Sequence, residues 1–216
     1  MANNMTLFTL HCSKCGKEEM IARPIIFDAA SHPEEAGEIK ADTYFSAKCP
    51  ACGDVQDFLM NMLYVDTGKL FMVALQPDEK LPIPMPHNQT VLRSSTLRLV
   101  RDSEDLAEKV RQLESGIDDR LITLAEYELY QKIRSALPAG SLMGMPVFHA
   151  GEDVPKISLP MDIKGKGYAM GTDTLDGKRL TELKETYGET LAKENNKGFR
   201  VIDRAWAEKI HEELGK

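Results

Sequence analysis

The chain has 216 residues, of which 42% are hydrophobic and 28% charged, and its formal net charge is -7. This composition is typical of an ordinary globular protein with room for one large domain or two small ones. The acidic balance argues against sequence-independent binding to nucleic acid or to an anionic membrane, because affinity for phosphates needs a surplus of lysine and arginine.

The first quarter of the chain predicts short strands that lead into two cysteine turns. A strand starting at Thr6 enters the first turn, residues 12–16, which we call the first knuckle. A strand over residues 43–48 enters the second knuckle, residues 49–53. Each knuckle has the sequence Cys-x-x-Cys-Gly, and the final glycine permits the tight backbone path of such a turn.

Further strands and one hairpin are expected around these knuckles. Residues 19–28 predict a strand broken at Pro24, and residues 31–38 are a loop or a short helix. The apolar runs 55–63 and 70–75, joined by a turn with Gly68, predict a hairpin. The layout is that of a zinc ribbon with additional strands.

The four cysteines, Cys12, Cys15, Cys49 and Cys52, predict a metal site. Two facing Cys-x-x-Cys turns supply the four thiolates of a closed tetrahedral site, with no position left for water or substrate. The N-terminus shows no signal peptide and no apolar stretch approaches membrane-spanning length, so we expect a cytoplasmic protein whose thiols stay reduced. We therefore favour structural Zn²⁺ over disulfides, and over a redox pair, which needs one Cys-x-x-Cys at a helix N-terminus.

Iron is the alternative metal. The pattern Cys-x-x-Cys-Gly followed by Cys-Pro-x-Cys-Gly is also that of rubredoxin, and four sulfurs in a tetrahedron accept either metal. The length of the attached chain favours zinc, as does an aromatic core limited to Phe8, Tyr44 and Phe45. A further alternative for the ligand set is that His11 or His32 replaces one of the four cysteines.

The middle of the chain predicts a connector, a strand and two helices. Four prolines between residues 77 and 86 mark an extended connector, and residues 91–100 predict a strand. Acidic residues at 102–105 begin a helix that ends at Gly116, and a second helix runs from 118 to just before Pro138. The two form a hairpin or one bent helix.

The last third predicts an α+β module. Residues 146–149, 156–163 and 198–203 are expected strands, and helices are expected around 180–191 and over 204–214. The single tryptophan, Trp206, is expected in the core; an exposed apolar patch around Trp206 or Phe148 would instead indicate a partner surface.

Other chemistry-bearing patterns have simpler explanations. Glu208 and His211 have the Glu-x-x-His spacing of di-iron bundles, but only one such motif is present, on a short terminal helix, so a solvated face is expected. Residues 165–168 lack the Gly-Lys-Ser/Thr ending of a phosphate loop and predict a turn between strands. Asp118 and Asp119 are expected to cap a helix, with Arg120 paired to one of them.

Several segments together resemble the CpXC family, an uncharacterised prokaryotic group named after its Cys-Pro-x-Cys motif. They are the two knuckles, residues 63–72, and the run from Leu97 through Val110 to Arg120. The resemblance covers roughly residues 6–137 and departs at Ser13, where the family commonly has proline. It implies a metal-bearing β domain followed by helices, and it brings no activity, substrate or partner.

The sequence therefore predicts an α+β protein in four parts: a zinc-ribbon-like β domain (1–76), a connector and strand (77–101), a helical hairpin (102–137) and a C-terminal α+β module (138–216). The expected role is a zinc-stabilised binding or interaction protein that acts through an unknown protein partner or by self-association. One alternative is an enzyme with a site in a cleft between modules, using Tyr64, Asp66, Asp118, Asp119 or Arg120. The other is a rubredoxin-like iron electron carrier.

Overall fold

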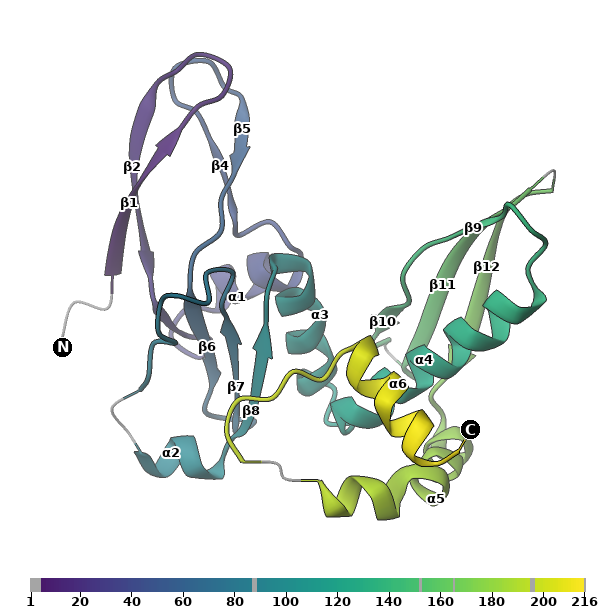
Figure 1. Ribbon diagram of the computed structural model, residues 1–216. Coiled ribbons are helices and arrows are strands. Elements are labelled where there is room, and N and C mark those ends of the chain that lie inside the picture. Colours follow the sequence, from purple (N-terminus) through teal and green to yellow (C-terminus); the bar gives the residue numbers. More distant parts are fainter. Residues whose placement is uncertain (1–4, 87–88, 152, 165, 195–196, 216) are drawn as a thin grey trace. The chain divides into compact units, whose positions relative to one another are not determined.

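The computed structural model describes residues 5–86, 89–151, 153–164, 166–194 and 197–215 (Figure 1). The chain forms two compact units: Met1–Val110 with Lys197–Arg200, and Arg111–Asn196 with Val201–Lys216. Both units contain helices and strands, which confirms the predicted α+β class. The finer borders expected at residues 76, 101 and 137 stay a prediction.

Two antiparallel hairpins carry the knuckles at their tips. The first pairs β1 (Met5–His11) with β2 (Glu18–Pro24), and the second pairs β4 (Ser46–Lys48) with β5 (Val55–Asp57). In Figure 1 the two hairpins extend from the rest of the first unit, with their turns close together. A two-stranded hairpin is marginal alone in water, so each needs support from its partner or from a metal.

A four-stranded mixed sheet forms the core of the first unit. Its order is β3 (Ile26–Asp28), β6 (Met62–Asp66), β7 (Phe71–Leu75) and β8 (Thr96–Val100), with an antiparallel β6–β7 hairpin between two parallel pairs. The predicted turn at Gly68 and the second strand of the hairpin are confirmed, but the first strand, expected over 55–63, is residues 62–66, since residues 55–57 form β5 and pair with β4. The apolar runs in β6 and β7 fit their position, because every residue from Met62 to Val65 and the whole of β7 are buried.

Both faces of this sheet are covered. On one face Leu63, Val65, Met72 and Ala74 form a cluster against which Val91 and Leu92 of helix α2 (Gln89–Ser94) pack. On the other face the rings of Phe27, Tyr64 and Phe71 stack in sequence, with centroids 5.4 and 6.0 Å apart. Helix α1 (Pro33–Lys40), at the place where a loop or short helix was expected, buries Ala36 and Ile39.

The single strand predicted over residues 91–100 was wrong in its first half, which is helix α2. A short apolar run such as Val91 and Leu92 occurs in both strands and helices. Here these two side chains pack on the sheet from a helix. The hydroxyls of Ser94 and Ser95 end it by donating to the carbonyl of Val91.

The strand predicted over residues 198–203 was also wrong. The segment makes one isolated parallel bridge, Arg200 to Arg98, in which the N–H of Leu99 donates to the carbonyl of Arg200 at 2.9 Å. Together with Phe199, which packs on the core, this bridge returns the chain to the edge of β8 in the first unit.

The second unit packs helices on a four-stranded antiparallel sheet. The sheet has the order β10 (Val147–His149), β11 (Lys156–Ile163) and β12 (Gly167–Thr174), and β9 (Leu142–Met143) also pairs with β11. Its helices are α4 (Asp119–Ala136), α5 (Gly177–Lys193) and α6 (Arg204–Glu213), while α3 (Ser103–Glu114) continues from the first unit into this one.

Aspartates start the helices of this unit, and its core is apolar. Asp118, Asp176 and Asp203 each accept a backbone N–H of the first turn that follows. Trp206 is 9% and Phe148 1% exposed, and both belong to the core cluster. The core position expected for Trp206 is confirmed, and neither side chain forms an exposed patch.

Strand β12 was not predicted, because its sequence is rich in glycine and polar residues. It pairs with β11 from Ile163↔Gly167 to Lys156↔Thr174, and Gly171 lies so close to α4 that an added Cβ would be 2.0 Å from the Ile133 Cδ1. Of the turn predicted at 165–168, Lys166 lies between these strands, whereas Gly167 and Tyr168 are the first residues of β12 and Gly165 is outside the described residues. Over the described chain, none of the helices combines the length and apolarity needed to cross a membrane.

Candidate metal centre

The first knuckle closes the β1–β2 hairpin through two backbone hydrogen bonds. The N–H of Cys12 donates to the carbonyl of Lys17, and the N–H of Gly16 donates to the carbonyl of Cys12, both at 2.9 Å. Gly16 has φ +73°, the left-handed conformation that favours glycine. This turn is why the sequence needs a glycine directly after the second cysteine.

The second knuckle has the same construction. The N–H of Cys49 donates to the carbonyl of Asp54 at 2.7 Å, the N–H of Gly53 donates to the carbonyl of Cys49 at 2.9 Å, and φ of Gly53 is +74°. The strand pairs that precede the knuckles also correspond, since His11 pairs with Glu18 and Lys48 pairs with Val55. Two turns of equal geometry therefore present two cysteines each.

The sulfurs of the two knuckles converge. All four Sγ atoms lie within 4.8 Å of one another, with Cys12 and Cys52 at 3.6 Å and Cys15 and Cys49 at 3.7 Å. A tetrahedral site with metal–sulfur distances of about 2.3 Å places its sulfurs about 3.8 Å apart. The cluster could therefore hold a metal ion, and the structure brings together all four cysteines named from the sequence.

The sulfurs differ in exposure and in acidity. Cys12 and Cys49 are buried, whereas Cys15 and Cys52 are exposed. The backbone N–H groups of Cys52 and Ala51 lower the pKa of the Cys49 thiol to about 7. The N–H of Asp54 lowers the pKa of the Cys52 thiol, but desolvation and the other three thiols outweigh it and raise this pKa to about 12. The neighbouring sulfurs thus oppose the ionisation of Cys52, and a cation at the centre would relieve that repulsion.

Polar contacts join the two knuckles beside the sulfurs. The N–H of Ser13 donates to Gln56 Oε1 at 2.9 Å, and Gln56 Nε2 donates to Asp54 Oδ2 at 2.7 Å. Lys14 Nζ lies 3.6 Å from Asp54 Oδ1. These contacts join the tips of the two hairpins. A proline at position 13, common in the family, would have no backbone N–H, whereas Ser13 uses its N–H to bind Gln56.

The histidines considered as alternative ligands have other partners. His11 Nδ1 lies 3.3 Å from Glu18 Oε1, and His32 Nδ1 lies 3.2 Å from the carbonyl of Asp28. Among the described residues, the group that could hold a metal consists of cysteines alone. The aromatic side chains near the hairpins are more extensive than expected, because Phe58 contacts both Phe8 and Phe45, at centroid distances of 4.9 and 6.0 Å.

Four of the five polar residues of the enzyme hypothesis have structural roles within their own units, and the fifth, Asp119, is the buried first residue of α4. In the first unit, Tyr64 is fully buried in the aromatic stack, and Asp66 accepts the N–H groups of Gly68 and Lys69 in the hairpin turn. In the second unit, Asp118 caps α4 and pairs with Arg120 at 2.6 Å. The interpretation of Asp118 as a cap paired with Arg120 is confirmed.

A polar network in the second unit was missed from the sequence. Glu128 of α4 accepts from Tyr187 of α5 at 2.5 Å and from Arg179 at 2.5 Å, and Arg179 also donates to Asp173 at 3.0 Å. His211 Nε2 lies 2.6 Å from the Tyr187 hydroxyl. Burial, followed by the bond to Glu128, raises the pKa of Tyr187. The solvated face expected for Glu208 and His211 is therefore confirmed for Glu208, which is exposed, and wrong for His211, which faces this network.

Fold and site define a class: a mixed α+β protein with a four-cysteine cluster that could bind a metal. Comparison with family models narrows this class, since the CpXC protein model matches residues 10–126. The chain belongs to the CpXC family, as its motifs predicted. No curated protein and no solved structure matches it.

Proposed function

We propose that this is a zinc-binding interaction protein in which Cys12, Cys15, Cys49 and Cys52 hold one structural Zn²⁺. The observation that carries the proposal is the convergence of four Sγ atoms within 4.8 Å from two knuckles of equal geometry. Four thiolates saturate tetrahedral Zn²⁺, so the ion would link the hairpins and leave no coordination position for chemistry. In this proposal the first unit is a zinc-ribbon-like domain, with one knuckle on each hairpin.

The proposed interaction role rests on two features: the closed coordination of the metal centre and the structural contacts of the polar side chains of the enzyme hypothesis. With no open metal position, and with Tyr64, Asp66, Asp118 and Arg120 engaged in packing, turn and cap contacts, the proposed role is binding of a protein partner in the reducing cytoplasm. The alternative of an iron electron carrier uses the same four sulfurs, so the test must separate the metals.

The test is metal analysis of the protein purified without added metal, together with its visible spectrum. The proposal expects one equivalent of zinc and no absorption in the visible range. A red protein containing iron and no zinc would establish the electron carrier instead. Absence of any bound metal after reduction and incubation with Zn²⁺ would reject both.

A further inference from the structure

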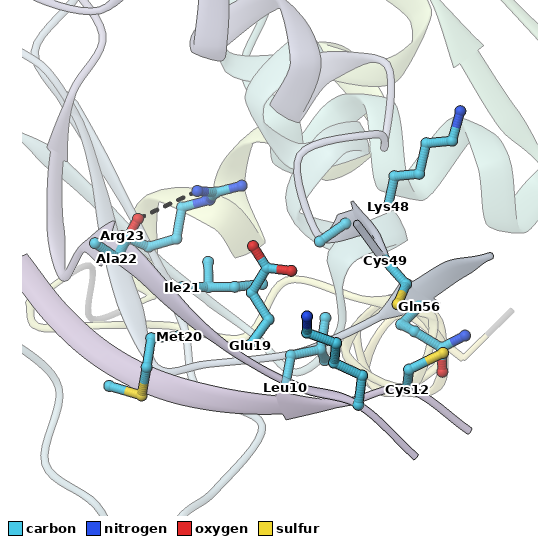
Figure 2. A pocket seen from close by; sticks show the side chains of 12 residues that line it. Leu10, Cys12, Glu19, Met20, Ile21, Ala22, Arg23, Lys48, Cys49 and Gln56 are labelled. Carbon is cyan, nitrogen blue, oxygen red and sulfur yellow. Dashed lines mark hydrogen bonds between the residues drawn. The ribbon is translucent and has the colours of Figure 1, made fainter. Parts of the chain in front are cut away.

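A cavity of about 270 Å³ lies between the two hairpins of the first unit. Residues 19–23 of β2 line one side, and residues 47–49 at the end of β4 line the other. Figure 2 shows Arg23 and Glu19 pointing into this space, with Cys12, Cys49 and Gln56 at its opposite end. The cavity is therefore a groove that ends at the metal centre, and we call it the interhairpin groove.

The backbone edge of β2 faces outward from its hairpin and has no strand partner among the described residues. Strands β1 and β2 pair only with each other, and the bond from Cys12 N–H to Lys17 O sets the alternation of their hydrogen-bonded pairs. In that alternation Ala22 is in a non-hydrogen-bonded pair with Leu7, so its N–H and C=O point away from β1. The carbonyl of Ala22 indeed accepts from the side chain of Arg23, at 3.1 Å.

The same reasoning applies to β4 across the groove. The bonds from Cys49 N–H to Asp54 O and from Phe58 N–H to Phe45 O place Ala47 in a hydrogen-bonded pair. Lys48 is then in the alternate pair, and its backbone N–H and C=O point away from β5. The groove is thus bordered by two strand edges that offer backbone donors and acceptors.

Apart from the thiolates of the metal centre at its end, the charged side chains that line the groove are mostly basic, in a chain whose net charge is -7. Lys17, Arg23 and Lys48 line it against one acidic residue, Glu19. Arg23 is fixed in place, because its guanidinium lies over the rings of Tyr44 and Phe58, at 5.2 and 5.6 Å from their centroids. Its Nε is buried without a hydrogen-bond partner in the described structure.

We propose that the interhairpin groove binds an extended acidic peptide segment of a partner protein, which adds to the open edge of β2 as a further strand. The edge supplies main-chain hydrogen bonds, as in other β-augmentation sites, and the basic residues select acidic side chains. This inference rests on the proposed function, because the metal-linked knuckles hold the two walls of the groove together.

The probe is the fluorescein-labelled peptide Thr-Val-Glu-Val-Glu-Val-Thr, titrated with the full-length, zinc-loaded protein and followed by fluorescence anisotropy. We expect saturable one-to-one binding that weakens with added salt. Ala22→Pro removes the outward N–H of β2 without touching its bonds to β1, and about tenfold weaker binding is expected, the size of one lost hydrogen bond. Leu7→Pro, at the paired position on the opposite edge of the hairpin, is the matched control and keeps the affinity.

A second pair of variants tests the charges without touching the backbone. Lys17→Glu is expected to weaken binding about tenfold or more, whereas Lys80→Glu, outside the groove, is not. The probe with both glutamates replaced by lysine is expected to show no saturation. Absence of saturable binding by the acidic probe, or equal affinity for the Ala22→Pro, Leu7→Pro and wild-type proteins, overturns the proposal.

Zinc content and the unfolding midpoint, measured on the same samples, separate this proposal from the one on which it rests. A protein that holds one zinc and folds but ignores the probe contradicts the groove alone. A protein without zinc contradicts the proposed function. Formation of a larger species without the peptide, observed by light scattering, assigns the groove to a second copy of this chain and overturns the partner peptide.

Discussion

The sulfur of Cys12 lies 3.6 Å from the sulfur of Cys52, which is forty residues further along the chain. Cys15 and Cys49 form the second such pair, at 3.7 Å. The first cysteine of each knuckle is thus paired with the second cysteine of the other knuckle. The sulfur contacts between the two knuckles therefore involve every one of the four cysteines.

Replacing Cys49 by serine is expected to abolish metal binding and to lower the free energy of unfolding by more than about 4 kcal/mol, because structural metal binding is itself folding free energy. Zinc content and urea denaturation measure the two effects. Ala51→Ser in the same knuckle leaves four sulfurs and serves as the control, with metal and stability unchanged. A folded Cys49→Ser protein of normal stability would show that the site does not maintain the fold.

Stability is expected to fall between about pH 10 and about pH 12 because of Tyr44. Desolvation is the main cause that raises the pKa of this phenol to about 12, from 10 in the unfolded chain, although nearby Arg23 lowers it. Over this interval the unfolded state binds fewer protons than the native state, so the free energy of unfolding decreases as pH rises. Urea denaturation at pH 9 and pH 11 measures the change.

The Tyr44→Phe protein provides the comparison for this pH effect. It retains a ring beside Phe27 and Phe45 but has no proton to lose, so its stability should fall less between the two pH values. Tyr187 contributes in the same direction, because burial also raises its pKa, and the difference between the two proteins isolates Tyr44. Equal losses in both would contradict the assignment.

Glu128→Gln is expected to destabilise the second unit by about 1–3 kcal/mol. The carboxylate accepts charge-assisted bonds from Arg179 and a bond from Tyr187, and the amide that replaces it presents a donor to one of them. Glu182→Gln is the matched control, because Glu182 lies 3.9 Å from Arg179 and is about half exposed. Its cost should stay within about 0.5 kcal/mol in the same urea experiment.

Two glycine-to-alanine changes should act in opposite directions. At Gly171 the new Cβ would lie 2.0 Å from the terminal Cδ1 of half-buried Ile133, so that side chain must leave its position, and about 0.5–1.5 kcal/mol of destabilisation is expected. At Gly188, inside α5, an added Cβ meets no atom within 4 Å, and alanine is expected to stabilise by about 0.5–1 kcal/mol. Thermal unfolding of the two variants compares them, and equal shifts would contradict the close packing of β12 on α4.

Local patterns were sufficient for the elements with strong signals. The spacing of cysteines and glycines located both knuckles, and the β6–β7 hairpin was evident from apolar runs around Gly68. Aspartates before an amphipathic segment located the start of α4, because an N-cap acts on the residues that directly follow it. These signals need only neighbouring residues.

Elements that depend on distant contacts were not predictable in this way. Helix α2 resembles a strand until Val91 and Leu92 are placed on the sheet. Strand β12 is polar because none of its residues is fully buried, and its Gly171 lies against Ile133 of α4. The network of Glu128, Arg179, Tyr187 and His211 combines residues from three helices, with 83 positions between its ends. A single sequence does not show that residues so far apart are in contact. A tyrosine or arginine on the buried face of a helix indicates only that some hydrogen-bond partner is needed.

The return of residues 197–200 to the edge of β8 limits how this chain can be rearranged in evolution. The family match ends at residue 126, yet Phe199 and Arg200 complete the unit that carries all four cysteines. Recombination that exchanged everything after the matched region would keep every metal ligand and still remove part of that unit. An incoming C-terminal segment is therefore compatible only if it supplies its own counterpart to these residues.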